Sequence, residues 1–542
     1  MIGLKTPAWK KPKGDIMRDF HLPGRSSVFG RNAMCATSNP LACKVALSTL
    51  ERGGNAIDAA IAGAILLGIC EPQMTGIGGD CFVLLKTNDS EKIIALNGSG
   101  KSPRALTPEK LTKKGLKVVP ENSADAVTVP GAIDAFCRLS DDYGKIGISA
   151  ILDPVIHYAE EGVPIGPRTS FDWQQNHENL QGIAKRYYLL EDTVPKPGQV
   201  FRAPKQAELL RKVALSGRTA FYEGEVAADM VNSLNKLGGS HTLEDFALAE
   251  SEYTTPISGS YNDLELVEHP PNGQGATAIL MNNILKEFDI SSMDPFGTIR
   301  AHIEAEAAKL AYDARNRFLA DPQYVTRLEH MLSRDTAKKL AKLIDKKAAM
   351  RFENTLTEQI HKDTIYLTVV DRELNIVSLI YSIFKSFGSG IASDKYGVLF
   401  QNRGSGFNLE KGHPNELGGN KRPMHTIIPG MLKKNDKIVM PFGVMGGAYQ
   451  PNGHSRFISN ISDFGMDPQE AIDGPRSFSD RGNMKVERGY STKVCSDLEN
   501  LGHQVSIPIE PIGGAQAIMI DYENGTFIGA SDPRKDGCAL GY

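Results

Sequence analysis

Thr364 and Ser382 are the two residues of this sequence whose types and spacing suggest a nucleophile. They stand at the outer ends of two apolar runs in TIYLTVVDRELNIVSLIYS, which are joined by the polar segment from Asp371 to Asn375. A turn centred on Glu373 makes the runs an antiparallel hairpin in which Thr364 faces Ser382, with Cβ atoms about 4.5–5.5 Å apart. The two hydroxyl groups are then within hydrogen-bonding reach, although a β-bulge would shift the pairing by one residue.

A threonine needs a base beside it to act as a nucleophile. An N-terminal threonine carries one, because its own α-amino group has a pKa of about 7.7–8.0. Thr364 gains this group only if the bond between Asp363 and Thr364 is broken, and its hydroxyl can do this by attacking the preceding carbonyl. Two interpretations follow: an ordinary threonine–serine pair in a hairpin, or a new chain that starts at Thr364, with Ser382 orienting its hydroxyl.

Gly446 and Gly447, in PFGVMGGAYQPNG, are candidates for an oxyanion hole. They follow a predicted strand, and without a Cβ their backbone N–H groups can approach a tetrahedral oxyanion closely. Donors of this kind contribute about 3–4 kcal/mol each. Taken alone, a Gly-Gly pair is more often an ordinary turn.

The elements that must position these residues follow from hydrophobic periodicity. Residues 40–70 are predicted helical, with a helix start at Asn55, and CFVLLKT and EKIIALN form a hairpin. Helical patterns dominate 104–250, and 299–321 is the clearest long helix. Strands are predicted at 364–371, 375–383, 396–402, 436–442 and 514–521. Strands that flank a helical middle predict a layered architecture of mixed α and β elements.

The bulk composition is that of a soluble globular protein. The 542 residues are 41% hydrophobic and 23% charged with a net charge of −3, which favours neither nucleic acid nor an anionic membrane as a partner. The N-terminus lacks the apolar core of a signal peptide, so we expect a cytoplasmic protein. Seven scattered cysteines without a CxxC motif are expected to be reduced.

No cofactor or metal is expected from the motifs. NGSGKS lacks the first glycine of a phosphate-binding loop, and GIGGDC lacks the third glycine of a dinucleotide fingerprint. There is also no HxxxH motif or Cys/His cluster to hold a metal ion.

Six further segments, in this order along the chain, resemble the γ-glutamyltransferase family: GGNAIDAAIA, EPQMTGIGGD, VPGAIDAF, FGSGI, FGMDPQEAIDGPR and GASDPRKDG. The resemblance implies an α+β fold, the four-layer αββα sandwich of N-terminal-nucleophile hydrolases. It also implies a precursor that cuts itself into a large subunit (1–363) and a small subunit (364–542) that share one intertwined core. Thr364 matches the family's catalytic threonine, Ser382 the hydroxyl that supports it, and Gly446-Gly447 the oxyanion glycines.

The positions that hold a γ-glutamyl group depart from the family pattern. Ser99 stands where an arginine holds the α-carboxylate, and Gly406 stands where an aspartate holds the α-amino group. Phe384 replaces an asparagine, and His425-Thr426 replace a pair of serines. Losing both counter-charges costs a glutamyl substrate several kcal/mol. Arg403, Arg422 and His425 are the candidates to replace the lost arginine.

We therefore predict a self-processing threonine amidohydrolase of the acylase-like, oxamate-amidohydrolase-like branch, acting on a small amide. The alternatives are a true γ-glutamyl hydrolase or transferase that acts on glutathione-type substrates, and a non-catalytic relative that binds a metabolite. The expected partners are the small-molecule substrate and the two subunits of one precursor. Assembly into a homo-oligomer is left open.

Overall fold

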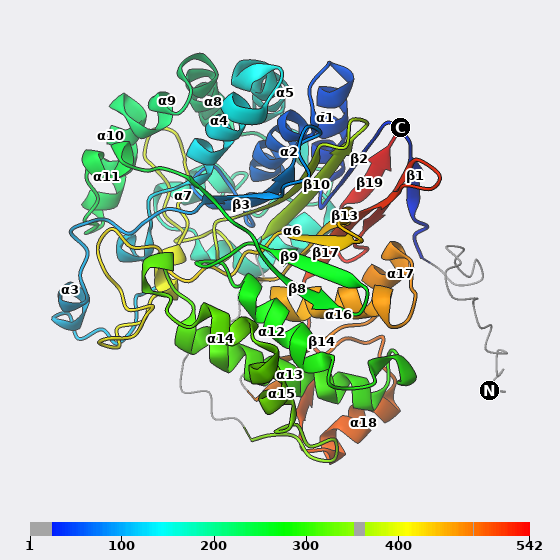
Figure 1. The fold of residues 1–542 in the computed structure, drawn as a ribbon. Helices are drawn as coiled ribbons and strands as arrows, with labels where there is room; N and C mark the ends of the chain where they lie inside the picture. Colours follow the sequence, from blue (N-terminus) through cyan, green and yellow to red (C-terminus); the bar gives the residue numbers. More distant parts are fainter. Residues whose placement is uncertain (1–23, 352–363, 481) are drawn as a thin grey trace.

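The computed structural model describes residues 24–351, 364–480 and 482–542. Its core is a pair of seven-stranded sheets, stacked face to face between two layers of helices (Figure 1). The predicted four-layer αββα sandwich is confirmed.

The first sheet carries the predicted nucleophile hairpin at its centre. Every neighbouring pair of its strands is antiparallel. In spatial order the strands are β19 (Cys538–Gly541), β2 (Ala33–Thr37), β10 (Ile365–Asp371), β11 (Ile376–Ser382), β3 (Asp80–Lys86), β4 (Ile94–Gly98) and β7 (Glu252–Thr254).

The second sheet carries the strand that leads into the Gly446-Gly447 turn. It too is antiparallel throughout. Its spatial order is β1 (Val28–Gly30), β18 (Thr526–Ser531), β17 (Gly514–Asp521), β13 (Lys437–Met445), β12 (Gly430–Lys434), β9 (Leu264–Glu268) and β8 (Ile257–Tyr261).

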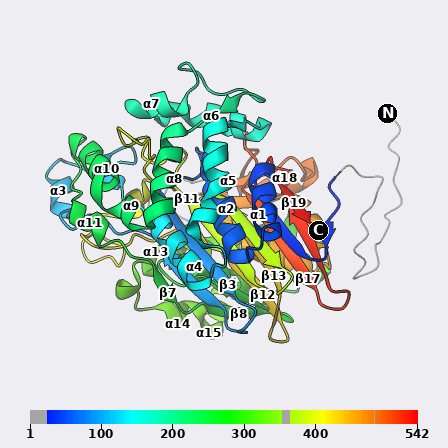
Figure 2. The same ribbon diagram turned by 90° about the horizontal axis from the view of Figure 1, so that it is seen from above.

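Helices cover the outer face of each sheet. Figure 2 shows the layer over the first sheet, which includes α1 (Pro40–Glu51), α2 (Ala56–Cys70), α4 (Ala132–Tyr143), α5 (Gly147–Glu161) and α8 (Pro204–Ser216). The layer on the second sheet includes α12 (Gly275–Leu285), α13 (Thr298–Phe318), α16 (Gln450–Ser462) and α17 (Pro468–Asp473). The remaining α-helices and strands of the described residues are α3 (Pro108–Thr112), α6 (Pro167–Asn176), α7 (Ile183–Tyr188), α9 (Thr219–Tyr222), α10 (Gly224–Lys236), α11 (Leu243–Ala247), α14 (Leu328–Leu332), α15 (Arg334–Ala341), α18 (Thr492–Asn500), β5 (Val163–Pro164), β6 (Val200–Phe201), β14 (Ser477–Asp480), β15 (Asn483–Val486) and β16 (Gln504–Ser506).

The core between the sheets comes from the inward-facing side chains of both. It includes Met34, Val370, Ile376, Met431 and Ile518, all almost fully buried. Strands buried on both faces read as continuous apolar runs, which is why β10 and β11 stood out in the sequence.

Most of the predicted elements are confirmed, with two corrections. The 40–70 region is two helices, and Asn55 caps the second by accepting hydrogen bonds from the Ile57 and Asp58 backbone N–H groups. The strand predicted at 396–402 is wrong: outside one isolated bridge, between Leu399 and Ala392, this segment is an irregular loop. None of the seven cysteines forms a disulfide.

Candidate active site

The predicted hairpin register is confirmed. Ile365 pairs with Tyr381, so Thr364 lies opposite Ser382, and the Thr364 Oγ1 to Ser382 Oγ distance is 3.4 Å. The turn is closed by the Asp371 carboxylate, which accepts hydrogen bonds from the Glu373 and Asn375 N–H groups. This Asx-type closure fixes the register that brings the two hydroxyls together.

A second contact restrains the Ser382 hydroxyl. Its Oγ accepts a hydrogen bond of 2.9 Å from the Phe384 backbone N–H. Phe384 has a φ of 79°, a left-handed conformation that is unusual for a bulky residue. The chain therefore turns sharply just after β11, and the turn holds Ser382 Oγ toward Thr364.

The Gly446-Gly447 turn converges on the same end of the hairpin. The Tyr366 ring lies against Gly443, and Ser378 Oγ donates to the Phe442 carbonyl. Ser378, which pairs with Thr368, therefore lies at Phe442, and Tyr366 lies one residue further on, at Gly443. The Thr364 end of β10 thus lies toward the Gly446 end of β13.

Both glycines are required by the backbone. Gly446 has φ 123° and Gly447 has φ 55°, a region that a residue with a side chain rarely adopts. Gln274 Nε2 donates to the Gly447 carbonyl at 3.0 Å and to the Thr426 carbonyl, and Arg315 Nη1 in turn donates to Gln274 Oε1. This buried network holds the turn, and nothing in the sequence pattern singled out Gln274 for it.

Arg403 lies beside the hairpin with much of its hydrogen-bonding capacity unused. Its guanidinium is fully buried, stacks on the Phe384 ring at 3.8 Å from the ring centroid, and donates from Nη1 to Thr426 Oγ1 at 3.0 Å. Nε and Nη2 have no partner among the described residues. Burial lowers the pKa of Arg403 to about 9, an effect that the nearby Asp80 carboxylate opposes.

Arg422 and His425, the other two candidates for the lost arginine, have a partner at each side-chain nitrogen. Arg422 donates to the Ser99 carbonyl, to Glu252 and to the Glu250 carbonyl. His425 Nε2 lies 3.2 Å from Asp80 Oδ2. Of the three, Arg403 alone has side-chain nitrogens without a partner among the described residues.

Asp80 is a buried carboxylate that sequence reasoning missed. Its Oδ1 accepts from the Gly100 and Gly131 N–H groups and from Gln401 Nε2. Burial raises the pKa of Asp80 to about 6, whereas burial, followed by Arg403 and His269, lowers the pKa of His425 well below its usual value. At neutral pH the pair is therefore a carboxylate and a neutral imidazole that donates from Nε2. The signal was available, because Asp80 closes the EPQMTGIGGD motif.

Ser99 and Gly406 lie in different surroundings. Ser99 Oγ is buried, donates to Asn97 Oδ1 at 2.6 Å and accepts from Asn272 Nδ2. At Gly406, an added Cβ would meet nothing closer than the Met424 carbonyl oxygen at 3.4 Å, an ordinary contact. A side chain can therefore be added at 406 far more easily than at 99.

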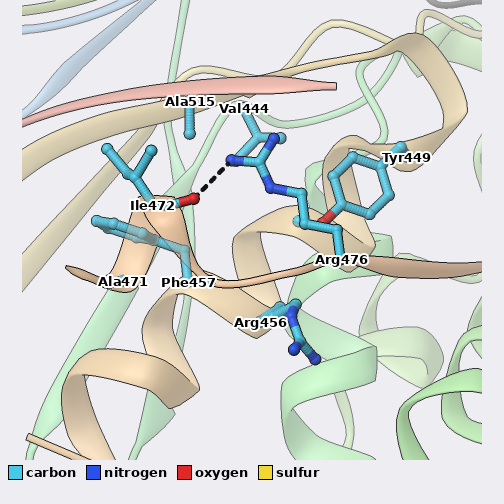
Figure 3. A pocket seen from close by; sticks show the side chains of 10 residues that line it. Val444, Tyr449, Arg456, Phe457, Ala471, Ile472, Arg476 and Ala515 are labelled. Atoms are coloured by element: carbon cyan, nitrogen blue, oxygen red, sulfur yellow. Dashed lines mark hydrogen bonds between the residues drawn. The ribbon is translucent and has the colours of Figure 1, made fainter. Parts of the chain in front are cut away.

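A small cavity of about 10 Å³ lies next to the glycine turn but offers no binding site (Figure 3). Its walls include Tyr449, Arg456 and Arg476. The Arg476 guanidinium is taken up by the Ile472 and Ile512 carbonyls and by Asp532. The cavity has room for about one water molecule, and it is a packing gap behind the turn.

Comparison with known proteins agrees with this geometry. Residues 42–542 match the model of the family described as gamma-glutamyltranspeptidase. The chain belongs to the gamma-glutamyltranspeptidase family. It is therefore an enzyme of the N-terminal-nucleophile hydrolase fold.

Similar proteins within this family carry different activities in their names. The chain is 33% identical over 531 residues to the glutathione hydrolase-like YwrD proenzyme of Bacillus subtilis (strain 168), covering 95% of this chain and 99% of the relative. It is 30% identical to the oxamate amidohydrolase proenzyme of Klebsiella pneumoniae, covering 95% and 100% of the two chains. The crystal structure of cephalosporin acylase from Bacillus halodurans superposes with a TM-score of 0.89 at 36% identity, over 97% of this chain and 99% of that one.

A helical membrane span would require a long apolar helix. No helix in the described part of the chain is long and apolar enough to cross a membrane.

Proposed function

We propose that this protein is a self-processing N-terminal-threonine amidohydrolase that cleaves small amides bearing a carboxylate. Thr364 is the nucleophile, and Arg403 binds the substrate carboxylate. The observation that carries this proposal is the buried guanidinium of Arg403, whose Nε and Nη2 have no partner among the described residues. It stacks on Phe384, the residue whose backbone N–H binds Ser382 Oγ.

Maturation comes first. The Thr364 hydroxyl attacks the carbonyl of Asp363, which lies outside the described residues, and the amide becomes an ester. Water hydrolyses that ester and frees the α-amino group of Thr364. The products are a large subunit (1–363) and a small subunit (364–542), which stay together because β10 and β11 lie between β2 and β3 in one sheet.

Turnover uses the new α-amino group as the base. It takes the proton from Thr364 Oγ1 as this oxygen attacks the substrate carbonyl, and Ser382 keeps Oγ1 in place. The Gly446 and Gly447 N–H groups stabilise the tetrahedral oxyanion. The protonated α-amine then gives its proton to the leaving nitrogen, and water hydrolyses the acyl ester to regenerate Thr364.

The geometry of Arg403 favours a carboxylate over other polar groups. Nε and Nη2 are the two nitrogens of one edge of the guanidinium, so their N–H bonds are parallel and match the two oxygens of a carboxylate. A buried guanidinium with unmade hydrogen bonds costs free energy, and a bound anion removes that cost. Phe384 supports the plane of the guanidinium from one face.

The substrate is small and has no α-ammonium group. A γ-glutamyl head needs a carboxylate for its ammonium, and Asp80, the buried acid near Arg403, already accepts from four donors. Oxamate-type amide acids satisfy Arg403 without this requirement. A glutathione hydrolase remains the second candidate, because Arg403 could also bind a glutamyl α-carboxylate. Comparing kcat/KM for glutathione with that for an oxamate-type amide tests the choice, and higher efficiency on glutathione would contradict our proposal.

We expect Ser382→Ala to reduce kcat by about 100-fold while KM changes little, because the missing hydroxyl orients the nucleophile without touching the substrate. Steady-state kinetics on processed enzyme measure the split. Ser386→Ala is the matched control, since Ser386 Oγ is also buried but has no hydrogen-bond partner among the described residues. Equal kcat in the native protein and the Ser382 variant would remove Ser382 from the mechanism.

We expect Gly406→Asp to raise γ-glutamyl turnover relative to turnover of the small amide acid, because it adds a carboxylate where the chain has room for one. Ser99→Arg, the other restoring change, is expected to destabilise the fold, because Ser99 belongs to a buried network with Asn97 and Asn272. The substrate ratio and the thermal midpoint of each single variant check these outcomes. A Gly406→Asp enzyme whose ratio stays unchanged would show that position 406 does not face the substrate head.

A further inference from the structure

Three buried side chains converge far from the nucleophile hairpin. His302 and Glu306 lie one turn apart on α13, and His503 lies in the turn between α18 and β16. One nitrogen or oxygen of each lies within 4.8 Å of the others. Histidine spacing along the chain does not predict this cluster, because the third member comes from a segment about 200 positions away.

The hydrogen bonds around His302 aim a lone pair at the centre of the cluster. His302 Nε2 lies 2.8 Å from the Asp345 carbonyl, which can only accept, so Nε2 carries the proton and Nδ1 is free of one. Nδ1 faces His503 Nε2 at 2.7 Å. A histidine that donates its far nitrogen to a backbone carbonyl is oriented as metal-binding histidines usually are.

His503 reaches the cluster through Nε2, which also lies 4.0 Å from Glu306 Oε1. A neutral imidazole binds a metal ion after its proton moves from Nε2 to Nδ1, which changes the tautomer but not the charge.

Lys309 is the competitor for this site. Its Nζ donates to Glu306 Oε1 at 2.6 Å and to the Met350 carbonyl at 3.0 Å. Glu306 Oε2 accepts from the Met350 N–H at 2.8 Å, which orients the carboxylate. Lys309 can give up Oε1 and keep its bond to Met350, so a cation with higher charge can replace it at Glu306.

We propose that His302 Nδ1, His503 Nε2 and Glu306 Oε1 form a binding site for one divalent transition-metal ion, of which Zn²⁺ suits two imidazoles and a carboxylate best. Three protein ligands leave a coordination position for water. The ion joins α13 to the segment after α18. If the chain is cut before Thr364, as proposed above, these elements belong to different subunits, and the ion then holds the subunits together.

The test uses the purified full-length protein as it is expressed. After exposure to Zn²⁺ and removal of free metal, we expect about one zinc per chain by elemental analysis, and competition with a chelator of known affinity gives the Kd. His503→Gln and Glu306→Gln should each weaken binding by about 100-fold or more. His330→Gln is the control, because His330 is exposed on α14 and lies outside the cluster.

Lys309→Met should change affinity in the opposite direction. Removing the competing cation is expected to tighten Zn²⁺ binding by about 10-fold, a result that a misfolded protein would not give. A native protein and a Lys309→Met variant that both fail to retain zinc would overturn the proposal. So would binding that His503→Gln leaves unchanged. Metal content is measured without substrate, so either result is separate from the fate of the amidohydrolase proposal.

Discussion

Thr364→Ala is expected to stay a single chain and to lose activity by about 10⁴-fold or more. Alanine has no hydroxyl to attack the Asp363 carbonyl, and none to attack a substrate. The hairpin should still form, since its register is set by the Asp371 turn and by the apolar faces of β10 and β11. A denaturing gel shows whether the chain is cut, and amidase assays give the residual rate.

Two variants control for this result. Thr368→Val alters the buried threonine of β10, whose hydroxyl donates to the Val377 carbonyl and lies away from the Thr364–Ser382 pair, and it should be cut and active. Thr364→Ser keeps a hydroxyl and should be cut, at a changed rate. A Thr364→Ala protein that is cut normally would mean that another group performs the cleavage.

Arg403→Met is expected to lower kcat/KM for a carboxylate-bearing amide by about 10²–10³-fold, the cost of leaving a buried carboxylate without its cation. The same variant should hydrolyse a matched amide without a carboxylate as well as the native enzyme does. Preference for the acid, measured as a ratio of the two kcat/KM values, should therefore disappear. Arg403→Lys keeps the charge but not the two parallel donors and should fall between them.

Stability separates this role from a structural one. Arg403 is buried with two nitrogens unsatisfied, but it also faces Asp80 and donates to Thr426, so replacing it by methionine should lower the free energy of unfolding only modestly. A large loss of stability, together with an unchanged preference for acids, would assign Arg403 to folding and contradict its role in binding.

The hairpin was predictable because its determinants are local. Two apolar runs and a polar turn at Asp371–Asn375 are enough to place Thr364 opposite Ser382. The strand predicted at 396–402 failed because its apolar residues are buried without pairing along a ladder. Val398 and Phe400 carbonyls accept from Ser393 and Ser389 instead, within one irregular loop.

The three candidates to replace the lost arginine could be told apart only by their contacts in the folded structure. Arg403, Arg422 and His425 are equivalent candidates in the sequence, and they differ in what already occupies their hydrogen bonds. Arg422 is taken up by partners from the 99 and 250–252 segments, which no spacing rule connects to it. Gln274 was missed for the same reason, since its role comes from contacts with the distant Thr426 and Gly447 carbonyls, whereas Asp80 could have been found from its motif.

The central claim is that a new chain begins at Thr364. Intact mass spectrometry of the purified native protein, with N-terminal sequencing of the smaller fragment, tests it most directly. We predict two fragments, the smaller running from Thr364 to Tyr542 and beginning Thr-Ile-Tyr-Leu. A fully active protein of one uncut chain, or a small fragment that begins at another residue, would contradict the mechanism.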